Sequence, residues 1–390
     1  MKLARLNIGF IPLVDAAPLI ASAEMGFAEE EGLVLNLERS PSWSTLRDKL
    51  CFGHLDAAHM LAPVPVAGAL GLGGDMAGLE ALSVLSINGN VIGVSRALAT
   101  RMRAAGHDFA FNDAQSAGQA LIGAMDSTLR IGVPFPFSMH AELVHYWLTA
   151  MGLEASQRVS VHTVPPPLMA DALRAGEIDA FCVGEPWGSS SVEEGVADLL
   201  LPCAAIWAFA PEKVLATRAG WADDNADLAQ RLIRALWRAA RWVSEPGSRA
   251  LATELLSRKP YLNLAPEIVE CALLGRFSIS ARGDLRHVPG FVDFFTGAAG
   301  FPWRSQAEWI GRHLAHRFGL DASLAIKAQS TFRSDIYRAA LGHVAHDLPS
   351  ASAKVEGAVT EPLAVGSVGG RLILPRDAFF DGRVFEPSPA

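Results

Sequence analysis

Polar and aromatic side chains suited to holding a small anion stand at the ends of several segments that read as buried strands. Five positions make up this set: Trp43, Asn90, His140, Gly184 and Lys213. They supply an aromatic wall, an amide, an imidazole, a residue small enough for close backbone approach, and an ammonium. Trp43 and His140 also stand near the starts of expected helices, where unpaired N–H groups and the helix dipole favour negative charge. The set is rich in hydrogen-bond donors and therefore indicates an anion-binding cleft.

Two of these positions are especially informative. Gly184 ends a strand-like stretch and is followed by Glu185 and Pro186; a residue before proline is held extended, so we expect the peptide at this strand end to be fixed. Lys213 follows an apolar run, where an unpaired ammonium is costly unless something neutralises it. A bound monoanion would do so. Taken singly, each residue has an ordinary structural explanation, and only their joint placement indicates a site.

Other chemistry has weaker support in the sequence. Cys51, His54 and His59 suggest a metal site, but they are expected to fall on a helix and on the following strand, unlike zinc ligands. The glycine-rich stretch 68–75 lacks the phosphate-loop pattern, and Ser138 has no nucleophile elbow around it. We therefore expect no catalytic residue, no metal and no cofactor. The four cysteines show no CxxC spacing and read as small buried residues of a reducing compartment.

Alternating strands and helices must position these residues. Three strands are expected early in the chain, at 6–13, 34–40 and 55–61, separated by helices at 17–32 and 42–54, the latter capped by Ser42. Strand–helix alternation of this kind predicts a parallel sheet covered by helices. Ligands of such sheets lie beyond the carboxyl ends of the strands.

A second series of the same kind follows a two-part strand at 81–95, which Asn88-Gly89 breaks at a crossing between lobes. Its elements are strands at 129–135, 159–165 and 178–184 and helices at 138–153 and 167–177. Strand-like segments at 197–221 return toward the first lobe, and the chain is then mostly helical to 340. The predicted fold is α/β with two lobes joined by a hinge. Lobe 1 comprises 1–95 and 213–340, lobe 2 comprises 96–212, and 341–390 is a tail wrapping lobe 1.

Composition limits the possible functions. Half of the 390 residues are hydrophobic, enough for a large core, and the net charge is −8. An acidic balance argues against direct nucleic-acid binding, which needs a basic excess. No uninterrupted apolar stretch reaches the length of a transmembrane helix. Asp15 and two prolines interrupt the one early stretch that looks like a signal peptide, so we expect no export leader and a cytoplasmic protein.

The chain resembles the nitrate/bicarbonate (NrtA/CmpA-like) solute-binding family of ABC transporters along nearly its whole length. The motifs that carry the resemblance, in family order, are GFIPLVDAAPLIASAEMGFAEEEGL, SWSTLRDKL, DAAHMLAPVP, MHAELVHYWL, VGEPW, PEKVL, PWRSQAEWI and LPRDAFFDGRVFEP. The resemblance implies a type II periplasmic-binding-protein-like fold with an anion between two lobes. It also implies that nitrate contacts fall on the five positions named above. At the hinge this chain has Asn88-Gly89-Asn90 where nitrate binders have Asn-Gly-Gln, so Asn90 is shorter and is expected to reach the anion less directly.

Lys213 favours nitrate over the family's other ligand. Nitrate has only acceptor oxygens, so it suits a cationic donor. The resemblance implies that bicarbonate binders of the family have a carboxylate at the position corresponding to Lys213, where it works together with calcium. We therefore expect nitrate, with nitrite close behind.

Three roles remain open for such a protein. The expected lack of a leader makes the chain similar to the cytoplasmic NasS-type nitrate/nitrite sensors, which hold an ANTAR-domain antiterminator (NasT-like) without ligand and release it on nitrate binding. The main alternative is the substrate-binding component of a nitrate, less readily a bicarbonate, ABC transporter. An enzyme of the same fold is the third, with only Cys182 and His140 near the cleft.

Overall fold

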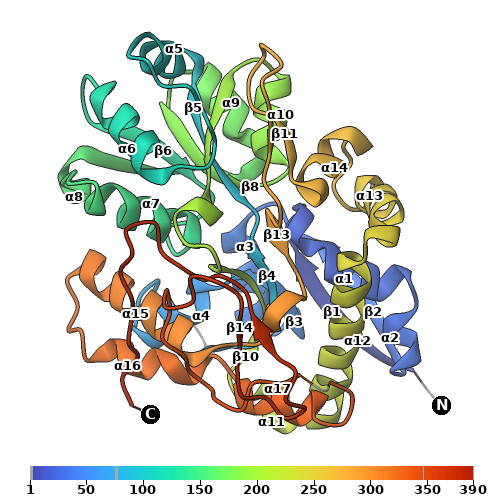
Figure 1. The fold of residues 1–390 in the computed structure, drawn as a ribbon. Coiled ribbons are helices and arrows are strands. Elements are labelled where there is room, and N and C mark those ends of the chain that lie inside the picture. The colour runs from blue at the N-terminus through green and yellow to red at the C-terminus, as the bar shows by residue number, and fades with distance from the viewer. Residues whose placement is uncertain (1–2, 75–77, 346, 390) are drawn as a thin grey trace.

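Two β-sheets organise the chain into two lobes (Figure 1). The computed structural model describes residues 3–74, 78–345 and 347–389. Across the first sheet the strands are β13 (Val292–Asp293), β4 (Leu79–Asn88), β10 (Pro211–Arg218), β3 (Ala57–Leu61), β1 (Ala4–Phe10) and β2 (Leu33–Arg39). Across the second they are β7 (Val159–Thr163), β6 (Leu129–Val133), β8 (Ala180–Gly184), β5 (Asn90–Ser95) and β9 (Ala197–Pro202).

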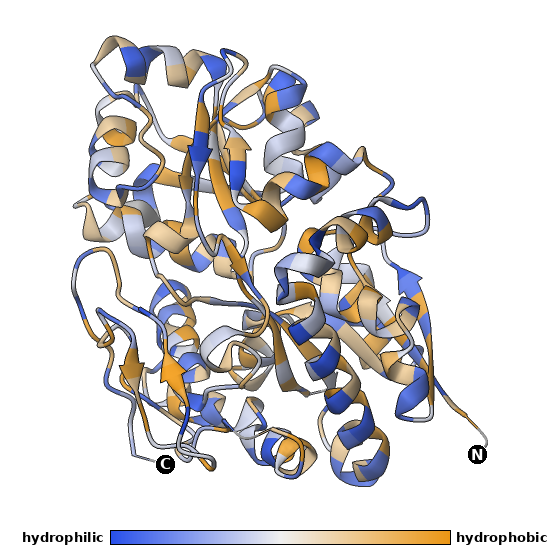
Figure 2. Ribbon diagram, turned by 45° about the vertical axis from the view of Figure 1, so that its right-hand side comes forward, coloured by the Kyte–Doolittle hydropathy of each residue, from blue (hydrophilic) through white to orange (hydrophobic). Residues whose placement is uncertain are grey.

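The strand–helix alternation produces parallel pairing, as predicted. β1 pairs in parallel with β2 and β3, and β6 pairs in parallel with β7 and β8. β10 runs antiparallel between β3 and β4, and β5 runs antiparallel between β8 and β9. The strands at the centre of both lobes are mostly in apolar colours in Figure 2, with short hydrophilic segments, whereas the surrounding helices carry both colours throughout. Each lobe therefore buries its sheet under amphipathic helices.

The predicted helices are present with shifted ends. The first lobe carries α1 (Ala17–Glu24), α2 (Phe27–Glu30), α3 (Trp43–Cys51), α4 (Pro63–Ala69), α11 (Trp221–Asp224), α12 (Ala226–Ser244), α13 (Arg249–Ser257) and α17 (Ser334–Leu341). The second carries α5 (Arg96–Ala104), α6 (Ala114–Gly123), α7 (Met139–Ala150), α8 (Ala155–Arg158), α9 (Met169–Arg174) and α10 (Trp187–Glu193). The single helix predicted over 17–32 is divided in two, because Gly26 adopts a left-handed conformation at φ 80°.

The crossing between the lobes lies at Asn88 and Gly89, where the two-part strand was predicted to break. Both residues have positive φ, 58° and 94°, and the chain leaves the first sheet there. β5 pairs only with strands of the second sheet, so 90–95 lies in lobe 2, whereas the predicted division put it at the end of lobe 1. The return occurs before Pro211, where β10 begins, so Glu212 lies in the first sheet as well.

The later part of the chain contacts both lobes. A hairpin of β11 (Arg276–Ser278) and β12 (Leu285–His287) lies between α14 (Pro266–Leu274) and α15 (Arg304–Phe318). In this hairpin the Ile279 carbonyl accepts a hydrogen bond from the Leu199 N–H of β9 in lobe 2, at 2.8 Å. The tail forms a short hairpin, β14 (Leu363–Ala364) with β15 (Ile373–Leu374). Phe379 of the tail stacks on Trp207, and Tyr146 of α7 donates to Asp381 at 2.8 Å. The tail thus reaches lobe 2 and does not wrap lobe 1 alone.

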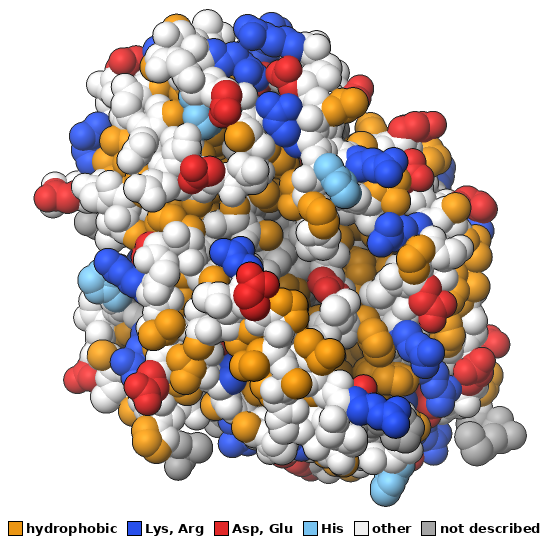
Figure 3. Space-filling view, in the orientation of Figure 1, with side chains coloured by type: hydrophobic (Ala, Val, Ile, Leu, Met, Phe, Trp, Pro, Cys, Tyr) orange, Lys and Arg blue, Asp and Glu red, His pale blue; other side chains and the backbone are white. Residues whose placement is uncertain are grey.

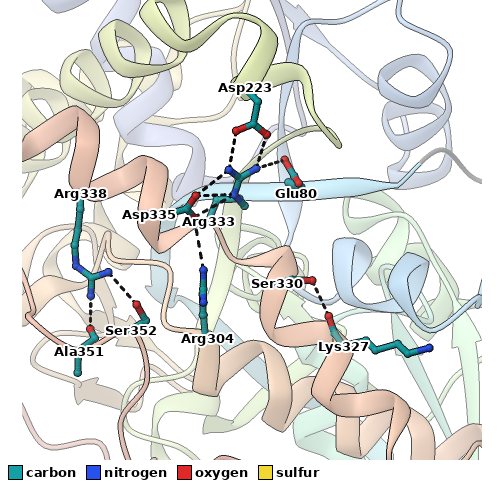
Figure 4. Close-up of polar contacts among 10 residues, drawn as sticks. All are labelled: Glu80, Asp223, Arg304, Lys327, Ser330, Arg333, Asp335, Arg338, Ala351 and Ser352. Carbon is teal, nitrogen blue, oxygen red and sulfur yellow. Dashed lines mark hydrogen bonds and ion pairs between the residues drawn. The ribbon is translucent and has the colours of Figure 1, made fainter. Parts of the chain in front are cut away.

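An ion-pair network ties α17 to the edge of the first sheet (Figure 4). Arg333 contacts Glu80 of β4, Asp223 of α11 and Asp335 of α17 at 3.0, 2.8 and 2.8 Å. The network joins three elements of one lobe. No helix in the described ranges combines the length and apolar character that a membrane span requires.

Candidate anion-binding site

The five predicted residues come together between the lobes. Trp43 at the start of α3 and Lys213 on β10 come from the first lobe, and Asn90 on β5, Gly184 at the end of β8 and His140 in the first turn of α7 come from the second. All five are buried, and the Lys213 and His140 side chains have no exposed surface. The Lys213 ammonium lies 5.6 Å from the centre of the Trp43 ring.

Serine caps position the two residues at helix starts. The Ser42 hydroxyl accepts a hydrogen bond from the Thr45 N–H at 3.2 Å, which confirms the predicted cap of α3. The Ser138 hydroxyl accepts from the Ala141 N–H at 3.2 Å and donates to the Phe135 carbonyl at 2.7 Å. The second cap was not predicted, although serine followed by a helical stretch was visible in the sequence. Both caps fix the first turn that carries a site residue.

Gly184 provides a close approach between the lobes. It pairs with Asn90 in the β5–β8 register. A Cβ atom at Gly184 would lie 3.2 Å from a Leu13 methyl and 3.3 Å from the Asn90 side-chain oxygen, tighter than ordinary contacts. The next peptide is held by hydrogen bonds from Val14 N–H to the Glu185 carbonyl at 2.9 Å and from Glu185 N–H to the Gly89 carbonyl at 3.1 Å. The strand end is therefore fixed, as expected, and a larger residue at 184 would require Leu13 and Asn90 to shift.

Lys213 is not the unpaired ammonium that the sequence suggested. Its Nζ lies 2.7 Å from Asp15 Oδ2 and 2.9 Å from Glu212 Oε1, and all three side chains are buried. Burial alone would lower the pKa of Lys213, but the two carboxylates outweigh it and raise that pKa. The positive charge is thus balanced within the protein, and a bound anion is not needed for that purpose.

A second pair of buried groups extends this cluster. His59 Nε2 on β3 lies 2.9 Å from Asp15 Oδ1, and its ring centre lies 5.8 Å from that of Trp43. Burial opposes ionisation of Asp15, yet Lys213 and His59 hold its pKa at about 2. Burial lowers the pKa of His59, and it lowers that of His140 further below its usual range. Asp15 is therefore a carboxylate, and both imidazoles are neutral near pH 7.

Sequence reasoning missed Asp15, His59 and Glu212 as members of the site. Asp15 was visible at a strand end, and His59 was considered only as a metal ligand. Glu212 and Lys213 are neighbours on one strand, so regular pleating would direct them to opposite faces. The β10–β4 register is irregular at Lys213 on both sides, which allows their side chains to meet. No local pattern reveals such an irregularity.

Several buried polar atoms of the site have no hydrogen-bond partner in the described part of the chain. They include Trp43 Nε1, Asn90 Nδ2 and Oδ1, both ring nitrogens of His140 and Glu212 Oε2; the Asp15 carboxylate oxygens and the His59 ring nitrogens likewise make no hydrogen bond of normal geometry, although they lie close to charged partners. Leaving such a group unpaired costs about 1–3 kcal/mol, so folded proteins seldom gather several in one place without a ligand. An indole N–H, an amide N–H and an imidazole beside an ammonium match a small oxyanion. These unpaired groups are the main structural evidence for a ligand site here.

The suggested metal site is not assembled. His54 is exposed, whereas His59 is buried against Asp15. Within the described ranges, no group of three or more His, Cys, Asp or Glu side chains has the arrangement to hold a metal ion.

The lobes are closed over the site. The Trp187 indole N–H of α10 donates to the Pro12 carbonyl at 2.9 Å, and the Val14–Glu185 hydrogen bond crosses the same boundary. Apolar side chains line the hollow between the lobes on the face shown in Figure 3. The site residues thus lie inside a closed two-lobed protein.

Comparison with known proteins agrees with this architecture. The NMT1-like family model matches residues 1–257, which include all of the site residues. The chain is 30% identical over 322 residues to the nitrate/nitrite binding protein NrtA of Nostoc, covering 80% of this chain and 70% of that one. It is 32% identical over 312 residues to the nitrate import ATP-binding protein NrtC of Synechocystis, but spans only 45% of that protein's length. The bicarbonate-binding protein CmpA of Synechococcus elongatus is 26% identical, over 99% of this chain and 85% of its own.

Solved structures show the same fold. The crystal structure of the periplasmic nitrate-binding protein NrtA from Synechocystis superimposes with a TM-score of 0.83 at 24% identity, covering 99% of this chain and 96% of that one. The alkanesulfonate-binding protein SsuA from Xanthomonas axonopodis pv. citri gives a TM-score of 0.56 at 16% identity over 85% and 95% of the two chains. The fold is that of the periplasmic binding proteins. The chain belongs to the NMT1-like family, among its NrtA/CmpA-like solute-binding members.

Proposed function

We propose that this protein binds nitrate, and nitrite as a close second, in the cleft between its lobes. The observation that carries the proposal is the group of buried, unpaired donors around Lys213: the Trp43 indole, the Asn90 amide and the His140 imidazole. Nitrate has three acceptor oxygens and no donor, so each oxygen can take one of these hydrogen bonds. The relatives named for binding nitrate support the same ligand.

The anion would join the two lobes. Trp43 and Lys213 come from the first, and Asn90, His140 and Gly184 come from the second. A ligand that contacts both lobes binds the closed state better than the open one and shifts the population toward closure. The role of Gly184 is to let backbone approach the anion, since a side chain there would occupy the space beside Asn90.

A calorimetric titration tests the ligand. The wild-type protein should release or absorb heat with nitrate and nitrite at millimolar concentrations or below. Asn90→Ala removes an amide that makes no hydrogen bond of normal geometry, so it should change the free energy of unfolding by no more than about 1 kcal/mol while weakening nitrate binding about tenfold. Asn112→Ala, at an exposed loop position, is the matched control and should change neither. Absence of any nitrate response in the wild-type protein would contradict the proposal.

As for biological role, we propose a cytoplasmic sensor for nitrate assimilation. Without ligand, the open form holds an ANTAR-domain antiterminator, and closure on nitrate weakens that complex. Because binding energies are reciprocal, the partner must weaken nitrate binding by the same factor, about 5–150-fold for typical coupling. The net charge of −8 supports a role in which the partner, and not this chain, contacts RNA. Basic and acidic side chains are interspersed on the face in Figure 3.

The alternative role is the substrate-binding component of a nitrate or bicarbonate ABC transporter. The names of NrtA, NrtC and CmpA favour it directly. In addition, Glu212 places a hydrogen-bond acceptor beside Lys213 that the O–H of bicarbonate would suit, so bicarbonate belongs in the titration.

Purified partners separate the two roles. A sensor should form a complex with the ANTAR-domain protein by size-exclusion chromatography and lose it when nitrate is added. Asn90→Ala, which leaves the ion pairs of Lys213 with Asp15 and Glu212 in place, should keep the complex but raise the nitrate concentration needed to release the partner. Failure to form the complex, together with nitrate-dependent stimulation of a reconstituted permease and ATPase, would reject the sensor in favour of the carrier.

A further inference from the structure

The site contains more negative charge than an anion receptor needs. Two carboxylates, Asp15 and Glu212, contact the single ammonium of Lys213. Asp15 remains ionised, because Lys213 and His59 both favour its charged form. Lys213 and Asp15 then cancel, and the remaining charge depends on Glu212. If Glu212 is ionised, an incoming anion meets a net negative site in a medium that screens charge poorly.

Glu212 has the surroundings of a carboxyl that can hold a proton. Its side chain has no exposed surface. Oε1 contacts Lys213 Nζ at 2.9 Å and lies 3.3 Å from His140 Nδ1 without a hydrogen bond of normal geometry, while Oε2 has no hydrogen-bond partner among the described residues. A proton on Oε2 therefore leaves the contact between Oε1 and Lys213 in place. The Asn90 amide lies close enough to favour the charged form, but it makes no hydrogen bond of normal geometry.

The titratable and charged groups that face Glu212 come from every element packed around it. They are Lys213 on β10, Asp15 before α1, His140 on α7 and Cys182 on β8, with His59 on β3 in contact with Asp15. Burial raises the pKa of Glu212, Lys213 opposes that rise, and Asp15 adds to it, so the pKa lies above its usual value. Burial keeps both imidazoles neutral and raises the pKa of the Cys182 thiol well above its usual value. Glu212 is thus the group whose proton the anion affects most directly.

We propose that anion binding at this site is coupled to the uptake of one proton by Glu212. This rests on the proposed binding of nitrate in the cleft and adds to it a dependence on pH. The anion takes the place of the Glu212 charge beside Lys213, and the proton from solvent moves to Oε2, so the total charge of the site stays the same. Glu212 acts here as a ligand-site residue that sets the charge, in addition to the five predicted from the sequence.

The sign of the pH dependence follows from this coupling. A bound anion raises the pKa of Glu212 above its value in the free protein. Between those two values, binding takes up a proton and the affinity for nitrate rises about tenfold for each unit that pH falls. Below the lower value Glu212 already carries its proton, and the affinity no longer depends on pH through this group.

Calorimetry with nitrate measures the coupling directly. Titrations of the full chain at several pH values, each in two buffers of different ionisation enthalpy, give the number of protons taken up. We expect a value approaching one in the middle of the range for the wild-type protein. Glu212→Gln imitates the protonated carboxyl, so it should bind nitrate with no proton uptake, and at high pH it should bind more tightly than the wild type. Glu361→Gln, at an exposed position in the tail, should behave as the wild type.

The outcomes separate this inference from the function on which it rests. No nitrate heat under any condition would reject the proposed function itself. Nitrate binding without proton uptake, and with a flat pH profile, would reject the coupling while leaving the function intact. If a folded Glu212→Gln variant still took up a proton on nitrate binding, the proton would have to go to another group. If that variant does not fold, infrared difference spectra of the wild-type protein decide: a protonated-carboxyl band should grow on nitrate addition, and its absence would overturn the assignment.

Discussion

Glu185 lies where β8 leaves the site, and its carboxyl group is buried. One oxygen accepts a hydrogen bond from the Ser189 N–H at 3.1 Å, and the other has no partner in the described ranges. Burial raises its pKa to about 7, against the opposing effect of Ser189. A buried carboxyl of this kind affects folding even though it holds no ligand.

The stability of the protein should therefore depend on pH through Glu185. A raised carboxyl pKa means that the folded state binds the proton more tightly, so this contribution is complete below the unfolded pKa and is lost as pH rises through about 7. The loss amounts to about 3 kcal/mol for a shift of this size. Denaturant unfolding between pH 4 and 8.5 should show that Glu185→Gln lacks this part of the slope. Glu193→Gln, at an exposed position at the end of α10, should retain it; equal slopes in both variants would refute the assignment.

Lys213 shows, also at the scale of single residues, that the identity of a residue does not predict its charged partners. The sequence placed an ammonium in an apolar setting, which is correct, and inferred that it lacked a partner, which is wrong. Its two carboxylate partners come from an adjacent position and from one nearly 200 residues earlier. The cluster thus depends on a strand irregularity and on a long-range pairing that no spacing in the sequence reveals.

At the scale of elements, helix caps connect the fold to the site. Ser138 holds the first turn of α7, in which His140 lies two residues later. Loss of the cap frees that turn and moves the imidazole relative to Lys213. Ser95 caps α5 in the same way, through the Leu98 N–H at 3.3 Å, but α5 carries no site residue.

Ser138→Ala should lower the free energy of unfolding by about 1 kcal/mol and should also weaken nitrate binding. Ser95→Ala should lower stability by a similar amount without affecting nitrate. Thermal unfolding and calorimetry on both variants provide the comparison. If the two variants lost nitrate affinity equally, the loss would reflect general destabilisation, and a positioning role for the α7 cap would be excluded.

At the scale of the whole molecule, the lobes meet through few polar contacts near the site. The Trp187–Pro12 hydrogen bond joins the two lobes, so we expect it to break when they separate. Contacts between the lobes stabilise the closed form relative to the open form. Because the ligand binds the closed form, its measured affinity falls when the closed form becomes less populated.

Trp187→Phe should therefore reduce nitrate affinity although Trp187 is not among the proposed ligand contacts. Loss of one hydrogen bond corresponds to about a fivefold weakening. The radius of gyration from solution scattering without ligand should also increase as the open form becomes more populated. Trp242→Phe, which alters a ring packed on Phe27 within the first lobe, is the control. Unchanged affinity and scattering in Trp187→Phe would show that this contact does not control closure.

The sequence by itself determined the order of strands and helices, the parallel pairing in both sheets, the crossing at Asn88-Gly89 and the cap at Ser42. It also identified five residues that the structure brings into one buried place. These features depend on near neighbours: apolar periodicity, turn residues and caps act within a few positions of each other. Strand ends in parallel sheets then gather at one edge, so residues chosen at strand ends meet.

Only the tertiary structure decided the charge of the site and the division of the lobes. Asp15, His59 and Glu212 join Lys213 because strands far apart in sequence lie side by side, with an irregular register at Lys213. The strand 90–95 belongs to lobe 2 because it pairs with β8 and β9, and the tail reaches α7 because Tyr146 donates a hydrogen bond to Asp381. Register and long-range pairing are set by how whole faces pack together, which local patterns do not encode.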